Sequence, residues 1–183
     1  MPTKPAKPVS DEAWVAATVV ALRTPEIDSW TGRIHVHKVL FLVDVLGLAK
    51  PPFRFELHQY GPYSFDLDRD IAMMEAFGQL NVEYTKPGYG PRYQITKAGL
   101  SLDSELPQRD RDAISRVVDE VGNKDSKQLE LLATCLWVTK RENVKDDDRA
   151  IDAVRRIKPR YSDEDIRKSL QQAKKMESKL KAA

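Results

Sequence analysis

An apolar helical stripe that ends at two prolines constrains this fold most. Within residues 31–47, apolar side chains recur at spacings of three and four, the period of one helix face. They are Val36, Val39, Leu40, Val43 and Leu46. Phe41 and Leu42 widen the stripe, so we expect most of this helix to lie in the core. Pro51 and Pro52 stop it, because proline lacks the backbone N–H and clashes with the preceding helical turn.

Two periodicities alternate after the prolines. Apolar and polar side chains alternate over residues 53–58, which predicts a half-buried strand. Residues 64–80 return to helical spacing, and residues 81–95 read as a hairpin around a turn rich in proline and glycine. The apolar residues of that helix are Leu67, Ile71, Met74, Phe77 and Leu80. This order predicts a winged helix, although such folds have two helices between the first strand and the hairpin, and residues 60–65 would have to supply the second.

The predicted fold class is mainly α (α+β). Residues 1–9, with their prolines and lysines, are expected to form a disordered lead. Residues 10–100 are expected to form a winged-helix-like domain with a small β-sheet or wing, whose first helix Ser10 caps. Residues 101–183 are expected to form a helical extension packed on it. From residue 97 onward, helices are predicted near 97–104, 108–121, 126–140, 146–157 and 163–181.

Composition favours a cytoplasmic protein without a membrane anchor. Hydrophobic residues make up 41% of the chain and charged residues 32%, as in ordinary soluble proteins. The longest apolar run, residues 39–43, is far too short to cross a bilayer. Cys135 is the single cysteine, which fits a reducing compartment, and its apolar surroundings in sequence predict a buried thiol rather than a nucleophile.

Positive charge gathers at the C-terminal end. Residues 155–183 contain ten Lys or Arg and four acidic residues, a net charge of +6, which leaves the rest of the chain at −4. Such a tail suits phosphate backbones or an acidic partner surface. A solvated helix face is the alternative, and the interleaved acids favour it.

The sequence HQYGPYSFDLDRD, residues 58–70, is predicted to be a strand-to-helix corner. Pro62 fixes its backbone angle, Ser64 can cap the next helix, and acids in the first turns complement the helix dipole. Of the two tyrosines that flank Gly61-Pro62, namely Tyr60 and Tyr63, we expect one to pack inside and the other to be exposed. The predicted partner-binding residues are Tyr60, Tyr63, Asp66, Asp68, Arg69 and Asp70.

Nucleic-acid binding is the alternative function. The helix over residues 64–80 has four acids and one arginine, a net charge of −3, which opposes contact with phosphates. The hairpin is the better candidate, because aromatic residues among cations suit sugar-phosphate contact. Its candidate residues are Lys86, Tyr89, Arg92, Tyr93 and Lys97.

No catalytic, cofactor or metal site is predicted. His35 and His37 lie two residues apart on a predicted helix, whereas helical metal ligands need spacings of three or four. Only an extended conformation would let them share a metal. Acid pairs exist, but any chain with 28 acids offers them. An enzyme of unrecognised type is the third class considered, and it would require a polar cluster lining a pocket.

Several motifs resemble the Panacea (SocA-like) antitoxins and a sibling group of bacterial and archaeal winged-helix proteins. The matching residues are Gly32-Arg33-Ile34, Lys38-Val39-Leu40-Phe41-Leu42-Val43-Asp44, Phe55, Tyr60-Gly61-Pro62-Tyr63-Ser64 and Leu67. The antitoxins usually have valine where Tyr63 stands, and the sibling group shares the tyrosine. The resemblance implies neutralisation of a toxin through protein contact, or delivery of a toxin to a protease. We therefore predict a non-enzymatic binding protein whose partner is a toxin or another defence-locus protein, with a winged-helix transcriptional regulator as the alternative.

Overall fold

The computed structural model describes residues 9–27, 32–84 and 90–182, and the fold is mainly helical with two small antiparallel sheets, as predicted. The helices are α1 (Asp11–Ala21), α2 (Arg33–Val45), α3 (Phe65–Ala76), α4 (Lys97–Asp103), α5 (Gln108–Val121), α6 (Ser126–Leu136), the π-helical η1 (Trp137–Arg141), α7 (Asp147–Ile157) and α8 (Asp163–Ala182). The strands are β1 (Glu56–His58), β2 (Gly61–Tyr63), β3 (Leu80–Glu83) and β4 (Arg92–Ile95).

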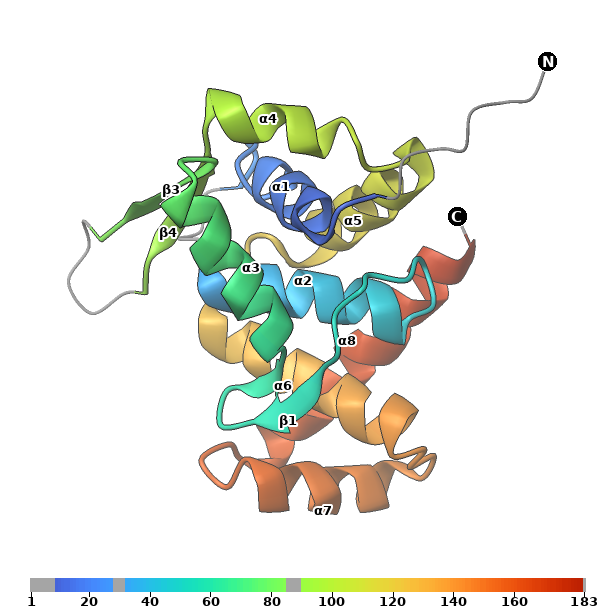
Figure 1. The fold of residues 1–183 in the computed structure, drawn as a ribbon. Coiled ribbons are helices and arrows are strands. Elements are labelled where there is room, and N and C mark those ends of the chain that lie inside the picture. Colours follow the sequence, from blue (N-terminus) through green and yellow to red (C-terminus); the bar gives the residue numbers. More distant parts are fainter. Residues whose placement is uncertain (1–8, 28–31, 85–89, 183) are drawn as a thin grey trace.

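Helix α2 runs through the middle of the molecule (Figure 1). Residues 35–43 of this helix are all buried, as the apolar stripe predicts. Helices α1 and α5 pack on one side of α2 and α6 on the other, while α8 packs against α6 and α7 forms the far end. One hydrophobic core joins residues on both sides of position 100, from Ala13 to Leu180.

One β-bridge brings the observed order of helices and strands into agreement with that of a winged helix. Gly32 pairs antiparallel with Arg92, so the short first strand lies before α2. Helices α2 and α3 therefore both lie between that strand position and the β3–β4 hairpin, the arrangement that the sequence reading lacked. The predicted strand at 53–58 is shorter than expected and belongs to a hairpin inserted between these two helices, in which β1 pairs with β2 through a two-residue turn.

Several predicted boundaries need correction. The helix expected over residues 64–80 ends at Ala76, because Gly78 takes a positive φ of 66° and Leu80 begins β3. Ser10 occupies the N-cap position of α1, but its side chain makes no capping hydrogen bond. The helix predicted over residues 126–140 is α6 continued by η1.

A second, smaller core lies between α6, α7 and α8. Its buried residues are Leu131, Cys135, Val138, Ala150, Ile151, Val154, Ile166 and Leu170. Ser162 caps α8 by accepting a hydrogen bond from the backbone N–H of Asp165. Among the described helices, none is both long enough and apolar enough to span a bilayer.

Candidate functional site

The Gly-Pro-Tyr-Ser corner is pressed against α6. Gly61 has a φ of 81°, which disfavours any side chain, and a Cβ there would lie 3.0 Å from Oγ1 of Thr134. Ser64 caps α3, since its Oγ accepts a hydrogen bond from the backbone N–H of Leu67. The corner is therefore both a structural turn, as predicted, and a close contact between two distant parts of the chain.

Two lysines hold the carbonyl groups of this corner. Nζ of Lys38, on α2, donates a hydrogen bond of 2.7 Å to the Pro62 carbonyl, and Nζ of Lys158 donates one to the Gln59 carbonyl. Lys38 is 1% exposed, and burial lowers its pKa to about 7. Nothing in the local sequence signals this arrangement, because the lysines come from elements far apart in the chain.

Buried Glu130 on α6 completes the network. Its carboxylate lies 2.8 Å from Nζ of Lys158 and 2.5 Å from the Arg160 guanidinium. Glu130 is 2% exposed, and these two cations are its counter-ions. The loop between α7 and α8 is thus tied to the corner and to α6.

An aromatic stack covers the N-terminal end of α3. The ring of Tyr63 lies parallel to that of His37, with centroids 4.2 Å apart, and contacts Phe65 edge to face. His58 packs against both Tyr63 and Phe65. Tyr60 is 48% exposed, so it is the exposed tyrosine and Tyr63 is the packed one.

Buried His37 and half-buried Asp68 form a polar pair beside Tyr63. Nδ1 of His37 accepts a hydrogen bond from the Ser64 N–H, so a neutral ring has its proton on Nε2, which lies 3.9 Å from the Asp68 carboxylate. Burial lowers the pKa of His37 to about 4. Burial, followed by the contact with Asp68, raises the pKa of Tyr63 to about 12. Arg33 approaches the same carboxylate at 3.1 Å, so half-buried Asp68 has a cation partner within the fold.

The predicted aspartates differ in their surroundings. Asp66 is exposed, whereas Asp70 is buried with only 10% of its side chain exposed, and Arg69 contacts both at 3.3 Å. Burial raises the pKa of Asp70, and nearby Asp11 raises it further. Asp70 is therefore buried and Asp68 half-buried, whereas Tyr60, Asp66 and Arg69 lie on the surface. Contact of these residues with a partner stays a prediction.

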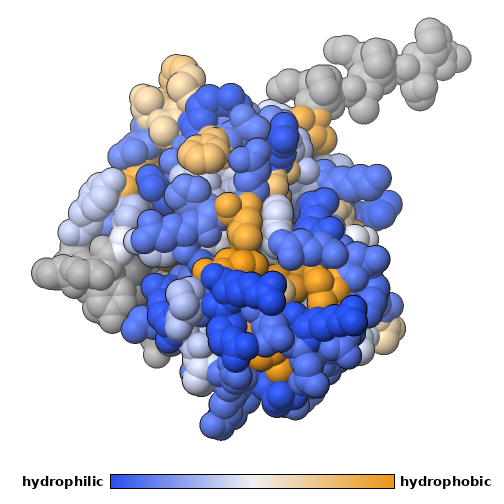
Figure 2. Space-filling model, turned by 90° about the horizontal axis from the view of Figure 1, so that it is seen from below, coloured by the Kyte–Doolittle hydropathy of each residue, from blue (hydrophilic) through white to orange (hydrophobic). Residues whose placement is uncertain are grey.

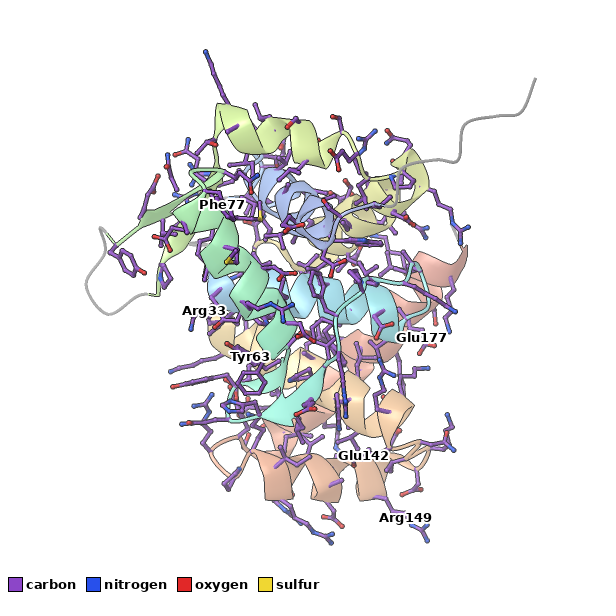
Figure 3. All side chains as sticks on the ribbon, in the orientation of Figure 1. Arg33, Tyr63, Phe77, Glu142, Arg149 and Glu177 are labelled. Carbon is purple, nitrogen blue, oxygen red and sulfur yellow. The ribbon has the colours of Figure 1, made fainter. Side chains whose placement is uncertain are left out.

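The sequence reading missed an apolar face on the outside of α3. We call it the α3 outer face, formed by Phe65, Ala72, Met73, Ala76 and Phe77, all exposed. Phe77 was expected in the core but is 69% exposed, and Phe65 is 62% exposed. These residues share one side of the helix, opposite buried Leu67, Ile71 and Met74. Figure 3 shows Phe77 near one end of α3 and Tyr63 near the other.

Of the predicted nucleic-acid residues, the three that the structure describes differ in exposure. Lys86 and Tyr89 lie outside the described residues. Tyr93 was expected on the hairpin surface, but it is 3% exposed and belongs to the main core, so this expectation is wrong. Lys97 is exposed at the start of α4, and Arg92 is half-buried on β4.

The basic tail is largely neutralised within the fold. Eight of its ten cations form ion pairs, namely Arg155, Lys158, Arg160, Arg167, Lys168, Lys174, Lys179 and Lys181. Acids from α5, α6 and α7 supply most of the partners. The interpretation as a solvated and paired helix face therefore fits better than a phosphate-binding tail.

The histidines and the cysteine occupy separate environments. Nε2 of His35 lies 2.8 Å from the Lys124 carbonyl, while His37 and His58 pack on Tyr63. His35 and His37 thus face different elements, as their spacing predicts. Cys135 is buried in the second core, where burial raises its pKa to about 12, so its thiol is a poor nucleophile.

Comparison with known proteins gives a distant relative and no function. The sequence matches no protein-family model. It is 26% identical over 148 residues to "Uncharacterized protein YwgA" of Bacillus subtilis (strain 168), an alignment that covers 76% of this chain and 83% of the relative. The chain is therefore similar over most of its length to this Bacillus protein, and the antitoxin resemblance stays a prediction.

Proposed function

We propose that this chain is a non-enzymatic protein-binding module that uses the α3 outer face to contact a protein partner. The observation that carries the proposal is the exposure of Phe65, Met73 and Phe77 along one helix that also packs on the core. Large apolar side chains gathered on one exposed surface are typical of interaction sites. Aromatic residues at such positions often contribute much of the binding free energy.

Charge around this face indicates a partner with basic residues. Given the helical turn of about 100° per residue, Arg69 and Asp66 lie among the apolar residues of the stripe, and Asp68 and Glu75 border one side of it. Asp11, at the start of α1, adds negative charge near buried Asp70. A partner with lysine or arginine beside an apolar stripe would match this pattern and relieve the repulsion among these acids.

The same features weaken the case for DNA binding by α3. In a winged helix, the helix before the wing is the usual reader of the major groove, but here the exposed side of that helix includes two phenylalanines and a methionine, and its net charge is −3. Most cations of the C-terminal tail are already paired, so they offer few free contacts to phosphates. The candidate DNA contacts that remain for the transcriptional-regulator alternative are the hairpin and Lys97.

The side chains that could act as a base or a nucleophile give little support to a catalytic role. Both ring nitrogens of His37 face the protein, one toward Ser64 and one toward Asp68. The Ser64 hydroxyl caps α3, and Cys135 is buried. These groups are used for structure, which favours binding as the function.

The resemblance to antitoxins suggests which partners to test first. The chain should be co-expressed with each protein encoded by the adjacent genes, and complexes should be separated by size-exclusion chromatography at 0.15 M salt. We expect a stable complex with a neighbour that carries a basic, partly apolar segment. Failure of every neighbour to form a complex would contradict the antitoxin-like form of the proposal.

The DNA alternative has its own test. Binding to a duplex that contains the upstream region of the gene should be titrated at several salt concentrations. Contacts with several phosphates would make the affinity fall steeply with salt. We expect weak binding without sequence preference, and tight salt-dependent binding to that duplex would favour the regulator instead.

A further inference from the structure

We propose that a cleft beside α7 binds a small ligand with several phosphate groups. The cleft has a volume of about 630 Å³ and lies between the η1–α7 loop and one face of α7. Lys145, Arg149 and Arg156 line it. Figure 3 places Arg149 at the α7 end of the molecule, and Figure 2, which views this end, shows a surface dominated by hydrophilic side chains. This site is separate from α3 and independent of the proposed protein contact.

These three cations stand out because their neighbours are paired. Across the described residues 137–182, most lysines and arginines form ion pairs with acids of α2, α5, α6, α7 or α8. Those without an ion pair in that stretch are Lys145, Arg149, Arg156 and Lys175. Three of these four cations line one cleft, so positive charge is concentrated there and available to a ligand.

The acids in the cleft are engaged by other groups. The carboxylate of Asp146 caps α7 by accepting a hydrogen bond of 2.9 Å from the backbone N–H of Arg149. Asp152 pairs with the guanidinium of Arg155 at 2.5 Å. Neither acid forms an ion pair with a cation of the cleft, so the three cations are not paired with the two acids and the formal net charge of the lining is +1.

The spacing of the arginines suits a ligand with more than one anionic group. Arg149 and Arg156 lie seven residues apart on the same face of α7, which places their backbones about 10 Å apart along the helix. Ala153 lies between them, and its small side chain leaves room for a ligand. Val144 and Asn143 form the opposite side, and the amide of Asn143 can donate a further hydrogen bond.

Phosphate is the anion that these groups fit best. The planar guanidinium of arginine can form two parallel hydrogen bonds with a phosphate group, and a lysine adds a flexible point charge. A chain of two or three phosphates could contact both arginines at once. The size of the cleft is also within the range usual for small-molecule sites.

Isothermal titration of the full chain at 0.15 M salt tests this proposal, with inorganic tripolyphosphate and a nucleoside triphosphate as probes. We expect saturable binding of one ligand per chain, with affinity reduced at least tenfold in both Arg149→Gln and Arg156→Gln. The matched control is Lys175→Gln, which removes one unpaired cation outside the cleft and should change affinity less than twofold. Binding of the nucleotide alone would show that the base also contributes, and binding of both would show that phosphates suffice.

Two results would overturn the site. One is the absence of saturable binding by both probes. The other is an equal loss of affinity in Lys175→Gln and in the two arginine variants, which would indicate general charge attraction. Far-UV circular dichroism and thermal unfolding of each variant check that the fold is intact, and Arg149→Lys should recover part of the affinity because it restores the charge.

Discussion

Nζ of Lys38 donates a hydrogen bond of 2.7 Å to the carbonyl oxygen of Pro62 in the interior of the protein. The two residues lie on the central helix and in the corner that leads into α3, so this bond links the core to the element that presents the proposed binding face. Glu130 and Lys158 extend the link to the C-terminal helices. The position of α3 thus depends on contacts between segments that are distant in sequence.

Replacement of Lys38 by methionine should change how stability depends on pH. The folded-state pKa of Lys38 is about 7, below its ordinary value of 10.5, so the unfolded chain binds more protons between these values. The lysine therefore costs stability at and below pH 7, and this cost declines as pH rises. Chemical denaturation should show wild type gaining about 2 kcal/mol relative to Lys38→Met between pH 7 and pH 9. Parallel stability curves for the two proteins would contradict the lowered pKa.

Removal of the buried anion should be strongly destabilising. Glu130→Gln leaves Lys158, which is 4% exposed, without its counter-ion, and breaking such a buried pair costs about 3–5 kcal/mol. The control is Glu164→Gln on the exposed surface of α8, whose pair with Lys168 is open to solvent and should contribute little. Urea denaturation of both variants measures the difference, and equal midpoints would mean that the buried network contributes no more than the surface pair.

The close approach at Gly61 can be separated from its backbone angle. Gly61→Ala must adopt a φ of 81° and also place its Cβ 3.0 Å from Thr134, so we expect a loss of at least about 2 kcal/mol. Gly47→Ala has a similar φ of 70° but meets no atom within 4 Å, so it should lose only about 1 kcal/mol. The difference between the two unfolding free energies measures the contact with α6, and a difference near zero would show that α6 adjusts freely.

Local patterns were sufficient to predict much of the fold. The apolar stripe of α2, the Ser64 cap and the C-terminal helices follow from periodicity and capping chemistry, and the structure has all of them. Strand β2 was missed because it has only three residues and contains Pro62, which lacks a backbone N–H. The single bridge at Gly32 has no sequence signal at all, yet it determines how the order of elements corresponds to a winged helix.

The candidate site was predicted only in part. The residues of the corner were recognised, and Tyr60 and Tyr63 do differ in exposure as expected. Burial of Tyr93 and exposure of Phe77 depend on how the hairpin and α3 pack, which a helical or alternating pattern does not specify. The pairing of Glu130 with Lys158 joins residues 28 positions apart in sequence and links both to the corner, and no local pattern indicates such contacts.

The central claim is that the α3 outer face binds a protein. Once a neighbour forms a complex, its affinity should be measured by isothermal titration with wild type, with the double variant Phe65→Ser/Phe77→Ser and with Leu100→Ser. Leu100 is the matched control, because it is a large apolar residue that is 49% exposed and belongs to α4 rather than to α3. We predict that the double variant loses at least a hundredfold in affinity while Leu100→Ser changes it less than twofold. Unchanged affinity in a correctly folded double variant would contradict the claim.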